Sequence, residues 1–494
     1  MTADRQCEKA EYPQRIVFGP SVSRQQGIRD FARNPVVTRH VRLLAGVAAL
    51  EPRIAPTPSD QRIELLDLIR GIALCGILAV NIFVMGTVGS TQGRVFPARW
   101  DADWIAWASQ RLLLEGPMRG LFMILFGAGM VMMLRKAEGE RPQVAPIDVW
   151  TRRCLALLAL GVVQFLVLMW PGEILWTLGI AGLPLLAFRT ARPRTLWVWA
   201  LVVIACLSAH RAYNTSGYLD SYQAAIAGER ARAEGQPVSP EQEAGLAAAE
   251  GAVRANYPTP ESLAAEVAQR TSLGSLVSWS AAGWAFRHLE IYSWIGVAES
   301  LAFMLVGMAL YRSGILTGAK PLQFYWWMLL AGGGVGLGLR LIDLWWQART
   351  GFELDIHQLN PTMSLLRSAW YQPARLALAL AYIALFVLLW RTGWRAWTSP
   401  FQAMGRTALT VYTLQSLLTS LLFYAFGYLG TFGAAGLLSV ALCICVLTAA
   451  FSMIWLSYRS MGPMEWLLRA VAYGTFSPGR DEETAGRRGR APPL

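Results

Sequence analysis

The sequence predicts an all-α, polytopic membrane helix bundle with about ten transmembrane helices and with both termini in the cytoplasm. Composition is the first observation: 54% of the 494 residues are hydrophobic and only 15% are charged, whereas about 25% of the residues in a soluble domain are charged. The second is a series of ten apolar segments, several of which approach the roughly 20 residues that a spanning helix needs. The third is the placement of the basic residues, which cluster in every second loop.

The ten apolar segments carry few charges and are separated by short polar loops, except for two longer segments on one side. In chain order, helices are expected at Leu68–Val88, Arg119–Leu134, Cys154–Trp170, Glu173–Phe188, Leu196–His210, Ile291–Tyr311, Phe324–Trp346, Arg375–Trp390, Leu409–Tyr428 and Ala434–Trp455.

The orientation of these helices follows from the loops between them. The short loops at residues 171–172 and 429–432 carry no Lys or Arg, whereas the loops on the opposite ends of the helices are basic. Basic loops stay in the cytoplasm, and an even number of helices returns the C-terminal tail to the same side as the N-terminus. The basic positions are Arg135, Lys136, Arg141, Arg152, Arg153, Arg189, Arg192, Arg194, Arg312, Lys320, Arg391, Arg395, Arg406 and the Arg residues of the C-terminal tail.

The same pattern divides the chain into five parts. Residues 1–61 form a basic segment that is expected to be a disordered cytoplasmic tail, and residues 475–494 form a second basic cytoplasmic tail. Two groups of membrane helices, at 62–211 and 291–474, flank an Ala- and Glu-rich outer insertion at 212–290, whose composition favours soluble helices. This insertion is either a helical cap over the outer mouth or a mobile segment without a role, and the sequence leaves both open.

The net charge of +12 is compatible with a nucleic-acid partner. The basic residues, however, lie in loops and tails rather than along one binding stripe, so no nucleic-acid partner is expected. No pair of the six Cys has zinc-ligand spacing with a His nearby, so no metal site is expected. The expected partners are the lipid bilayer and a small-molecule or lipid-linked substrate. The oligomeric state is left open.

Polar side chains inside membrane helices are costly, so each is a candidate for function. In the first expected helix, Asp67 and Arg70 are three residues apart on one face. That face continues through residues 74 and 77 to Asn81, about 16 Å further along the axis. We therefore expect a polar stripe from the inner edge toward the outer half of the bilayer. The alternative is an Arg70 that reaches the cytoplasmic interface and pairs with Asp67.

Five further polar residues lie in or beside later helices. Gln164 can bridge to a neighbouring helix, and Glu173 opens a helix, where a carboxylate is favoured as a cap. Glu299 lies inside a helix, where an unpaired carboxylate would be expensive. Arg340 and Asp343 are three residues apart, and we expect them to pair with each other, in either a structural or a substrate-facing role.

The segment Gly405–Ser416 is polar for a membrane helix. Arg406 lies near its start, and its residues Tyr412, Gln415 and Ser416 fall on one helical face. That face offers hydroxyl and amide groups either to a substrate or to hydrogen bonds between helices.

His288 precedes the helix expected at Ile291–Tyr311 and stands near Glu290. A His with a nearby carboxylate can serve as a general base. A solvated loop His is the more frequent case, and it is the one expected here.

Three stretches resemble the YeiB-like bacterial inner-membrane family, which is built on domain of unknown function 418. The first leads from Arg62 through Leu-Asp-Leu-Ile-Arg-Gly to Asn81, and the second is Leu-Phe-Met-Ile-Leu-Phe-Gly at residues 121–127. The third joins Gly405–Ser416 to Gly-Pro-Met-Glu-Trp at residues 462–466 and to Arg469. The resemblance covers roughly residues 62–474, and it implies a multi-pass protein of the bacterial cell inner membrane with a role in transport.

The Leu-Asp-x-x-Arg-Gly opening is also distantly similar to that of the transmembrane acyltransferases, which implies an acyl-donor tunnel near Asp67, Arg70 and Asn81. The departures weaken that implication. Residues 89–117 lack the His on which the acyltransferases rely, and Gln164 and Glu173 stand where family members often have His and Asp. A Gln cannot act as a base.

Two functions lead, and a structural or signalling role in the membrane is a third possibility. The first is transport or translocation of a small or lipid-linked solute, with no cofactor. The alternative is acyl transfer from acyl-CoA to a sugar, lipid or metabolite acceptor. The missing His favours transport.

Overall fold

The fold was analysed in a computed structural model, which describes residues 63–89, 100–139, 145–290, 293–350, 356–393 and 397–474. The chain divides into two units, Met1–Arg53 and Ile54–Leu494, and all described residues belong to the second. The two tails expected at residues 1–61 and 475–494 lie outside the described residues.

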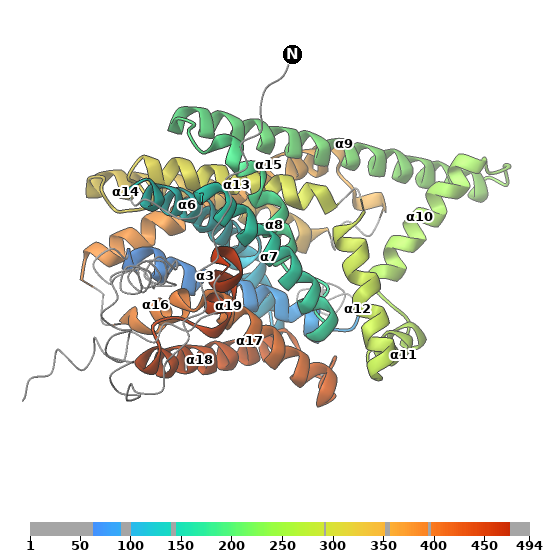
Figure 1. Cartoon of the computed structure of the whole chain (residues 1–494). Coiled ribbons are helices and arrows are strands. Elements are labelled where there is room, and N and C mark those ends of the chain that lie inside the picture. Colours follow the sequence, from blue (N-terminus) through green and yellow to red (C-terminus); the bar gives the residue numbers. More distant parts are fainter. Residues whose placement is uncertain are drawn as a thin grey trace, which may run out of the picture. The chain divides into compact units, whose positions relative to one another are not determined.

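The described residues are mostly helical (Figure 1), with no strand among them, which confirms the all-α prediction. The α-helices are α3 (Glu64–Gly86), α5 (Ala102–Ser109), α6 (Pro117–Gly139), α7 (Pro146–Val167), α8 (Leu175–Gly182), α9 (Pro193–Ala233), α10 (Pro240–Asn256), α11 (Pro260–Ala268), α12 (Leu273–His288), α13 (Ser293–Arg312), α14 (Leu322–Arg349), α15 (Pro361–Arg391), α16 (Ser399–Arg406), α17 (Ala408–Ser420), α18 (Ala434–Tyr458) and α19 (Pro463–Tyr473).

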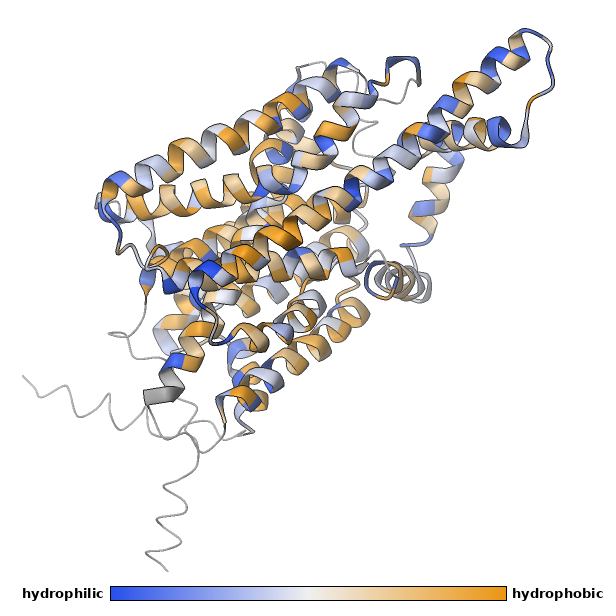
Figure 2. Ribbon diagram, turned by 90° about the horizontal axis from the view of Figure 1, so that it is seen from above, coloured by the Kyte–Doolittle hydropathy of each residue, from blue (hydrophilic) through white to orange (hydrophobic). Residues whose placement is uncertain are grey.

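Within the described residues, nine helical segments are long and apolar enough to cross a membrane. The ten expected helices correspond to these nine and to one short apolar segment, Leu175–Phe188, made of α8 and the 3₁₀ turn η3 (Pro184–Phe188). The protein is therefore a multi-pass membrane protein. Figure 2 shows the apolar residues along the packed helices, and the polar residues gathered toward helix ends. The cytoplasmic position of the termini stays a prediction.

The segment between the first two expected helices also contains helix. Its amphipathic stretch Trp104–Leu114 lies in α5 and the π-helical turn η2 (Gln110–Leu114). These elements run into α6, so that Ala102–Arg135 counts as a single apolar segment.

Two pairs of helices approach each other closely at glycines. At Gly405 a β-carbon would lie 1.9 Å from the backbone oxygen of Asp67, and at Gly71 it would lie 1.9 Å from that of Phe401. These two contacts bring α16 against the first turns of α3. Gly127 and Gly307 join α6 and α13 in the same way. Small residues at such crossings are typical of membrane helices, whose association depends on close backbone packing.

The insertion at residues 212–290 is helical. Helix α9 has 41 residues and is therefore about 60 Å long, twice the roughly 30 Å of a hydrocarbon core. Its C-terminal part packs on α10 through Tyr222, Ala225 and Leu246, and this polar hairpin extends beyond the apolar bundle (Figure 2). After α11, the chain returns through α12, which packs on α7 and α13.

Candidate functional site

The polar face of α17 meets α7 and the loop that follows α7. Gln164 of α7 donates a hydrogen bond from Nε2 to the Ser416 hydroxyl at 2.9 Å, which confirms the expected bridge between helices. The Ser416 hydroxyl donates in turn to the backbone oxygen of Tyr412 at 3.1 Å. The Tyr412 hydroxyl accepts the backbone N–H of Ile174 at 3.1 Å. Helix α17 thus holds the start of α8 through one tyrosine.

The loop between α7 and α8 places Glu173 inside the protein. It turns at Met169, a non-glycine residue with φ of 54°, an uncommon conformation that costs energy. The turn is fixed by Ser420, whose hydroxyl donates to the backbone oxygen of Leu168, and by Trp170, which is buried. As a result, Glu173 is only 2% exposed.

Glu173 caps α8 as expected, and it does so in a buried position. Its carboxylate accepts the backbone N–H groups of Leu175 at 2.6 Å and of Trp176 at 3.1 Å. It also accepts the indole N–H of Trp284 at 3.3 Å. Burial raises the pKa of Glu173 from 4.5 to about 7, although these three donors oppose the shift.

The residue paired with Glu173 is His288, at the end of α12. The His288 Nε2 lies 3.5 Å from the Glu173 carboxylate and 3.2 Å from the Glu173 backbone oxygen. The Nδ1 lies 3.0 Å from the backbone oxygen of Trp284. His288 is 8% exposed and Glu290 is exposed. The expectation of a solvated His beside Glu290 is therefore wrong, because α12 folds back onto α7.

Aromatic rings enclose this pair. Trp284 stacks on His288 with ring centroids 5.1 Å apart, and on Phe165 of α7 with centroids 4.4 Å apart. Trp176 meets Trp284 edge-on at 5.0 Å. The Ser280 hydroxyl donates to the backbone oxygen of Phe165 at 2.8 Å, which fixes α12 on α7. The site is thus a buried His–Glu pair held in an apolar cage.

A small cavity of about 10 Å³ lies on the other side of Tyr412. This volume is just enough for one water molecule. The Nε2 of Gln415 is buried and has no hydrogen-bond partner among the described residues, so it can serve a water or a polar ligand group there. The three expected residues Tyr412, Gln415 and Ser416 indeed share one cavity, and its other lining residues are Ile77, Leu78, Asn81, Met85, Trp170 and Thr419.

The expected Asp67–Arg70 pair is present at 3.0 Å. Arg70 also donates to the backbone oxygen of Gly405 at 3.3 Å, next to Arg406, whose guanidinium reaches the Ser460 backbone oxygen. The polar stripe expected from Arg70 to Asn81 is wrong. The intervening positions on that face are Leu74 and Ile77, both buried, and they separate the two polar groups.

The third stretch of the family resemblance also has a structural explanation. Glu465 of α19 accepts the backbone N–H groups of Leu409 and Thr410 at 2.6 and 3.2 Å, and the Thr410 hydroxyl at 2.6 Å. A carboxylate at this place satisfies N–H groups that the first turn of α17 leaves free. Glu465 therefore fixes the start of the helix that carries Tyr412 and Gln415.

A second group of charges lies inside the bundle, between α6, α13 and α15. Glu299 accepts from Arg119 and forms an ion pair with Arg375 at 2.7 Å. Gln372 donates to the same carboxylate at 3.0 Å. The Arg375 side chain is 3% exposed, whereas that of Arg119 is 40% exposed. Sequence reasoning found Glu299 but not its partners, because they come from two other helices.

Arg340 and Asp343 do not pair with each other in the part of the chain that the structure describes, so that expectation is wrong. Arg340 donates to the backbone oxygens of Leu112 at 2.7 Å, of Glu115 at 3.0 Å and of Arg111. Asp343 instead accepts from Arg367 of α15 and from Gln347, the latter at 2.7 Å. Arg340 thus lies against three backbone oxygens at the end of η2, while Arg367 from α15 supplies the positive charge beside Asp343.

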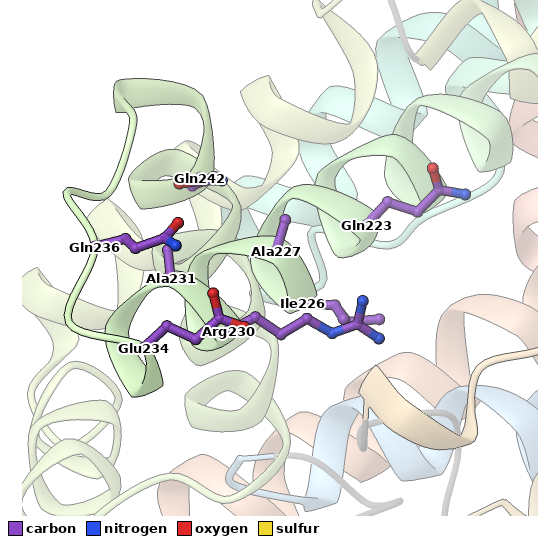
Figure 3. A pocket seen from close by; sticks show the side chains of 8 residues that line it. All are labelled: Gln223, Ile226, Ala227, Arg230, Ala231, Glu234, Gln236 and Gln242. Carbon is purple, nitrogen blue, oxygen red and sulfur yellow. The ribbon is translucent and has the colours of Figure 1, made fainter.

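A wider hollow, of about 430 Å³, lies on the hairpin of α9 and α10 (Figure 3). It is lined by side chains of mixed charge, such as Arg230 and Glu234. It contains none of the residues described above, and we assign no role to it. No group of metal-binding residues occurs among the described residues.

The chain resembles several known proteins. Residues 310–475 match the model of a family described as protein of unknown function (DUF418). The chain is 28% identical to the uncharacterized protein YxaH of Bacillus subtilis (strain 168) over 442 residues, which cover 86% of this chain and 98% of that protein. It is 29% identical to the uncharacterized protein YeiB of Escherichia coli (strain K12) over 429 residues, which cover 85% and 98%. This chain is thus similar to the YeiB-like DUF418 proteins.

The DUF418 segment begins at the end of α13 and includes α14 to α19. It therefore contains Arg340, Tyr412, Gln415 and Glu465. Glu173 and His288 lie before it in the chain. No solved structure matches the chain.

Proposed function

We propose that this protein is a transporter or translocase of a small or lipid-linked solute in the bacterial cell inner membrane. One observation supports the proposal most strongly: the group of Glu299, Arg119, Arg375 and Gln372 joins three membrane-spanning helices. Ionisable residues inside a bundle are costly, and they commonly mark the path of a solute.

The charge of this group favours an anionic solute. Glu299 faces two guanidinium groups, and Arg340 nearby binds backbone oxygens rather than a carboxylate. The Nε of Arg375 is buried without a hydrogen-bond partner among the described residues. Arg119 is the accessible member of the group. A carboxylate or phosphate of the solute can replace Glu299 on these planar guanidinium donors.

The test is flux into vesicles that contain the purified protein, with a panel of carboxylates, sugar phosphates and lipid-linked sugar phosphates. Arg119→Gln should lower the flux of the transported solute at least about tenfold, a loss of about 1.4 kcal/mol. Arg254→Gln is the matched control, because Arg254 forms an exposed pair with Glu250 on α10. Absence of flux for the entire panel, or equal flux in all three proteins, would contradict the proposal.

The His288–Glu173 pair supports a second candidate, an acyltransferase that uses acyl-CoA. It supplies the imidazole that residues 89–117 lack, with a carboxylate beside it. However, both ring nitrogens already face backbone oxygens, so His288 must leave Glu173 before it can act as a base. Stabilisation of the purified protein by acyl-CoA, together with an acylated product by mass spectrometry, would support this candidate. Failure of both would exclude it.

A further inference from the structure

The surroundings of His288 contain more hydrogen-bond acceptors than a neutral imidazole can serve. The backbone oxygen of Trp284 faces Nδ1, while the backbone oxygen and carboxylate of Glu173 face Nε2. A neutral imidazole has one N–H and one bare nitrogen. In the neutral ring with an ionised Glu173, the lone pair of one nitrogen would therefore face oxygen.

One additional proton resolves this conflict. Placed on the ring, it gives two N–H donors for the oxygens and leaves Glu173 as the acceptor of its three N–H groups. Placed on the Glu173 carboxyl, it can be donated to Nε2. Both forms hold the same number of protons, so the pair is one site for one proton.

Burial determines where this proton rests. It raises the pKa of Glu173 to about 7 and lowers the pKa of His288, which favours the proton on the carboxyl group. The neighbouring elements bring few other titratable groups. Arg287 of α12 adds a positive charge that disfavours the imidazolium, and Tyr412 of α17 lies near the carboxylate. Phe165 of α7 and Trp176 of α8 bring no charge.

The site also has a polar connection to the interior. Tyr412 joins the α8 start, through Ile174, to the cavity that Asn81 and Gln415 line. The unpaired Nε2 of Gln415 provides a donor there. Tyr412 therefore contacts both the loop that carries Glu173 and a cavity with room for one water.

From this geometry we propose that Glu173 and His288 form a proton-binding site that couples proton movement to solute transport. The inference rests on the transport function proposed above for the coupling, but not for the proton site itself. No bond other than O–H and N–H forms or breaks: the proton arrives from water on one side of the membrane and leaves to water on the other.

The proton site is tested without a solute, in the full chain reconstituted in lipid nanodiscs. Infrared spectroscopy reports the protonated carboxyl group, and nitrogen-15 NMR of His-labelled protein reports the imidazole. The two signals should together lose one proton between about pH 6 and about pH 8. In Glu173→Gln the carboxyl signal should be absent and the imidazole should stay neutral throughout this range.

Glu465→Gln is the matched control, because Glu465 also caps a helix through its carboxylate, but its hydrogen-bond donors are Leu409 and Thr410 rather than an imidazole. It should leave both signals of the pair unchanged. A pair that neither gains nor loses a proton from about pH 5.5 to about pH 8.5 would overturn the proposal, and so would an unchanged titration in Glu173→Gln.

Coupling is tested separately in vesicles that contain the pH indicator pyranine. The solute panel of the flux assay should change the internal pH with wild type and at least about tenfold less with Glu173→Gln, a difference of about 1.4 kcal/mol. Solute flux without any pH change would overturn the coupling and leave transport standing. Proton titration without flux of any solute would instead overturn transport and leave the proton site standing.

Discussion

Replacing His288 by Gln should make the stability of the protein strongly dependent on pH, although it removes a titratable group. In the variant Glu173 stays buried, but its nearest proton-sharing partner is lost. Its pKa is raised from 4.5 in the unfolded chain to about 7 in the folded protein. A raised pKa contributes stability that is fully present below 4.5 and is lost as the pH rises through 7.

The expected loss of unfolding free energy in His288→Gln follows from the two pKa values of Glu173. The interval between 4.5 and about 7 corresponds to about 3 kcal/mol of unfolding free energy. Wild type behaves differently, because its unfolded chain carries the same proton on the imidazole of His288, with an ordinary pKa of 6.5. Folded and unfolded wild type then release one proton at nearly the same pH. The unfolding free energy of wild type should therefore fall by less than about 1 kcal/mol over this range.

The measurement is equilibrium unfolding in mixed detergent micelles at a series of pH values, for wild type and His288→Gln in parallel. Taking the difference between the two proteins removes the contribution of the other titrating groups. The control is His357→Gln, since His357 forms a comparable His–Glu pair with Glu229 at 3.0 Å but in an exposed place. Its curve should run parallel to that of wild type. A parallel curve for His288→Gln as well would refute the shared proton.

Three further predictions concern the packing of the bundle. Glu299→Gln should lower the unfolding free energy by about 3–5 kcal/mol, because Arg375 keeps a buried charge without its carboxylate; a loss below about 1 kcal/mol in the same unfolding assay would contradict the buried pair. Gly405→Val should abolish or strongly reduce the yield of folded protein, because the new side chain meets the Asp67 backbone. The control Gly338→Val, with open space around it, should fold normally. Equal yields would contradict the close approach of α3 and α16. Glu465→Gln should cost about 1–2 kcal/mol, because two N–H groups of α17 keep only a neutral acceptor, and an unchanged free energy of unfolding would contradict the cap.

Hydropathy predicts the helices of this protein because membrane segments must satisfy their backbone groups internally. All ten expected segments are helical in the described residues. The short helix α8 shows the limit of this argument. Apolar composition extends over residues 175–188, but Pro184 ends the α-helix and starts a 3₁₀ turn. Composition alone does not register that change.

Contacts along one helix were predicted less reliably than the helices themselves. The spacing of three residues predicts both an Asp67–Arg70 pair and an Arg340–Asp343 pair, yet only the first occurs. The difference lies in what each Arg meets from other elements. Arg340 lies against the carbonyl end of η2, a π-helical turn that no sequence pattern indicated. Spacing along one helix does not predict the pair when other elements supply partners to both side chains, as η2 does for Arg340 and α15 does for Asp343.

The pairing of His288 with Glu173 was missed because 115 residues separate them in the chain. A signal for it exists in the sequence. The buried residues of α12 are Leu276, Ser280, Trp284 and His288, which recur at intervals of four and therefore form one helical face. A face that begins with Leu and contains Trp predicts burial of the His at its end.

This stripe also bears on the two alternatives for the insertion. Since α12 supplies both the ring that stacks on His288 and the indole that binds Glu173, the insertion supplies half of the candidate site, which a mobile segment without a role would not do.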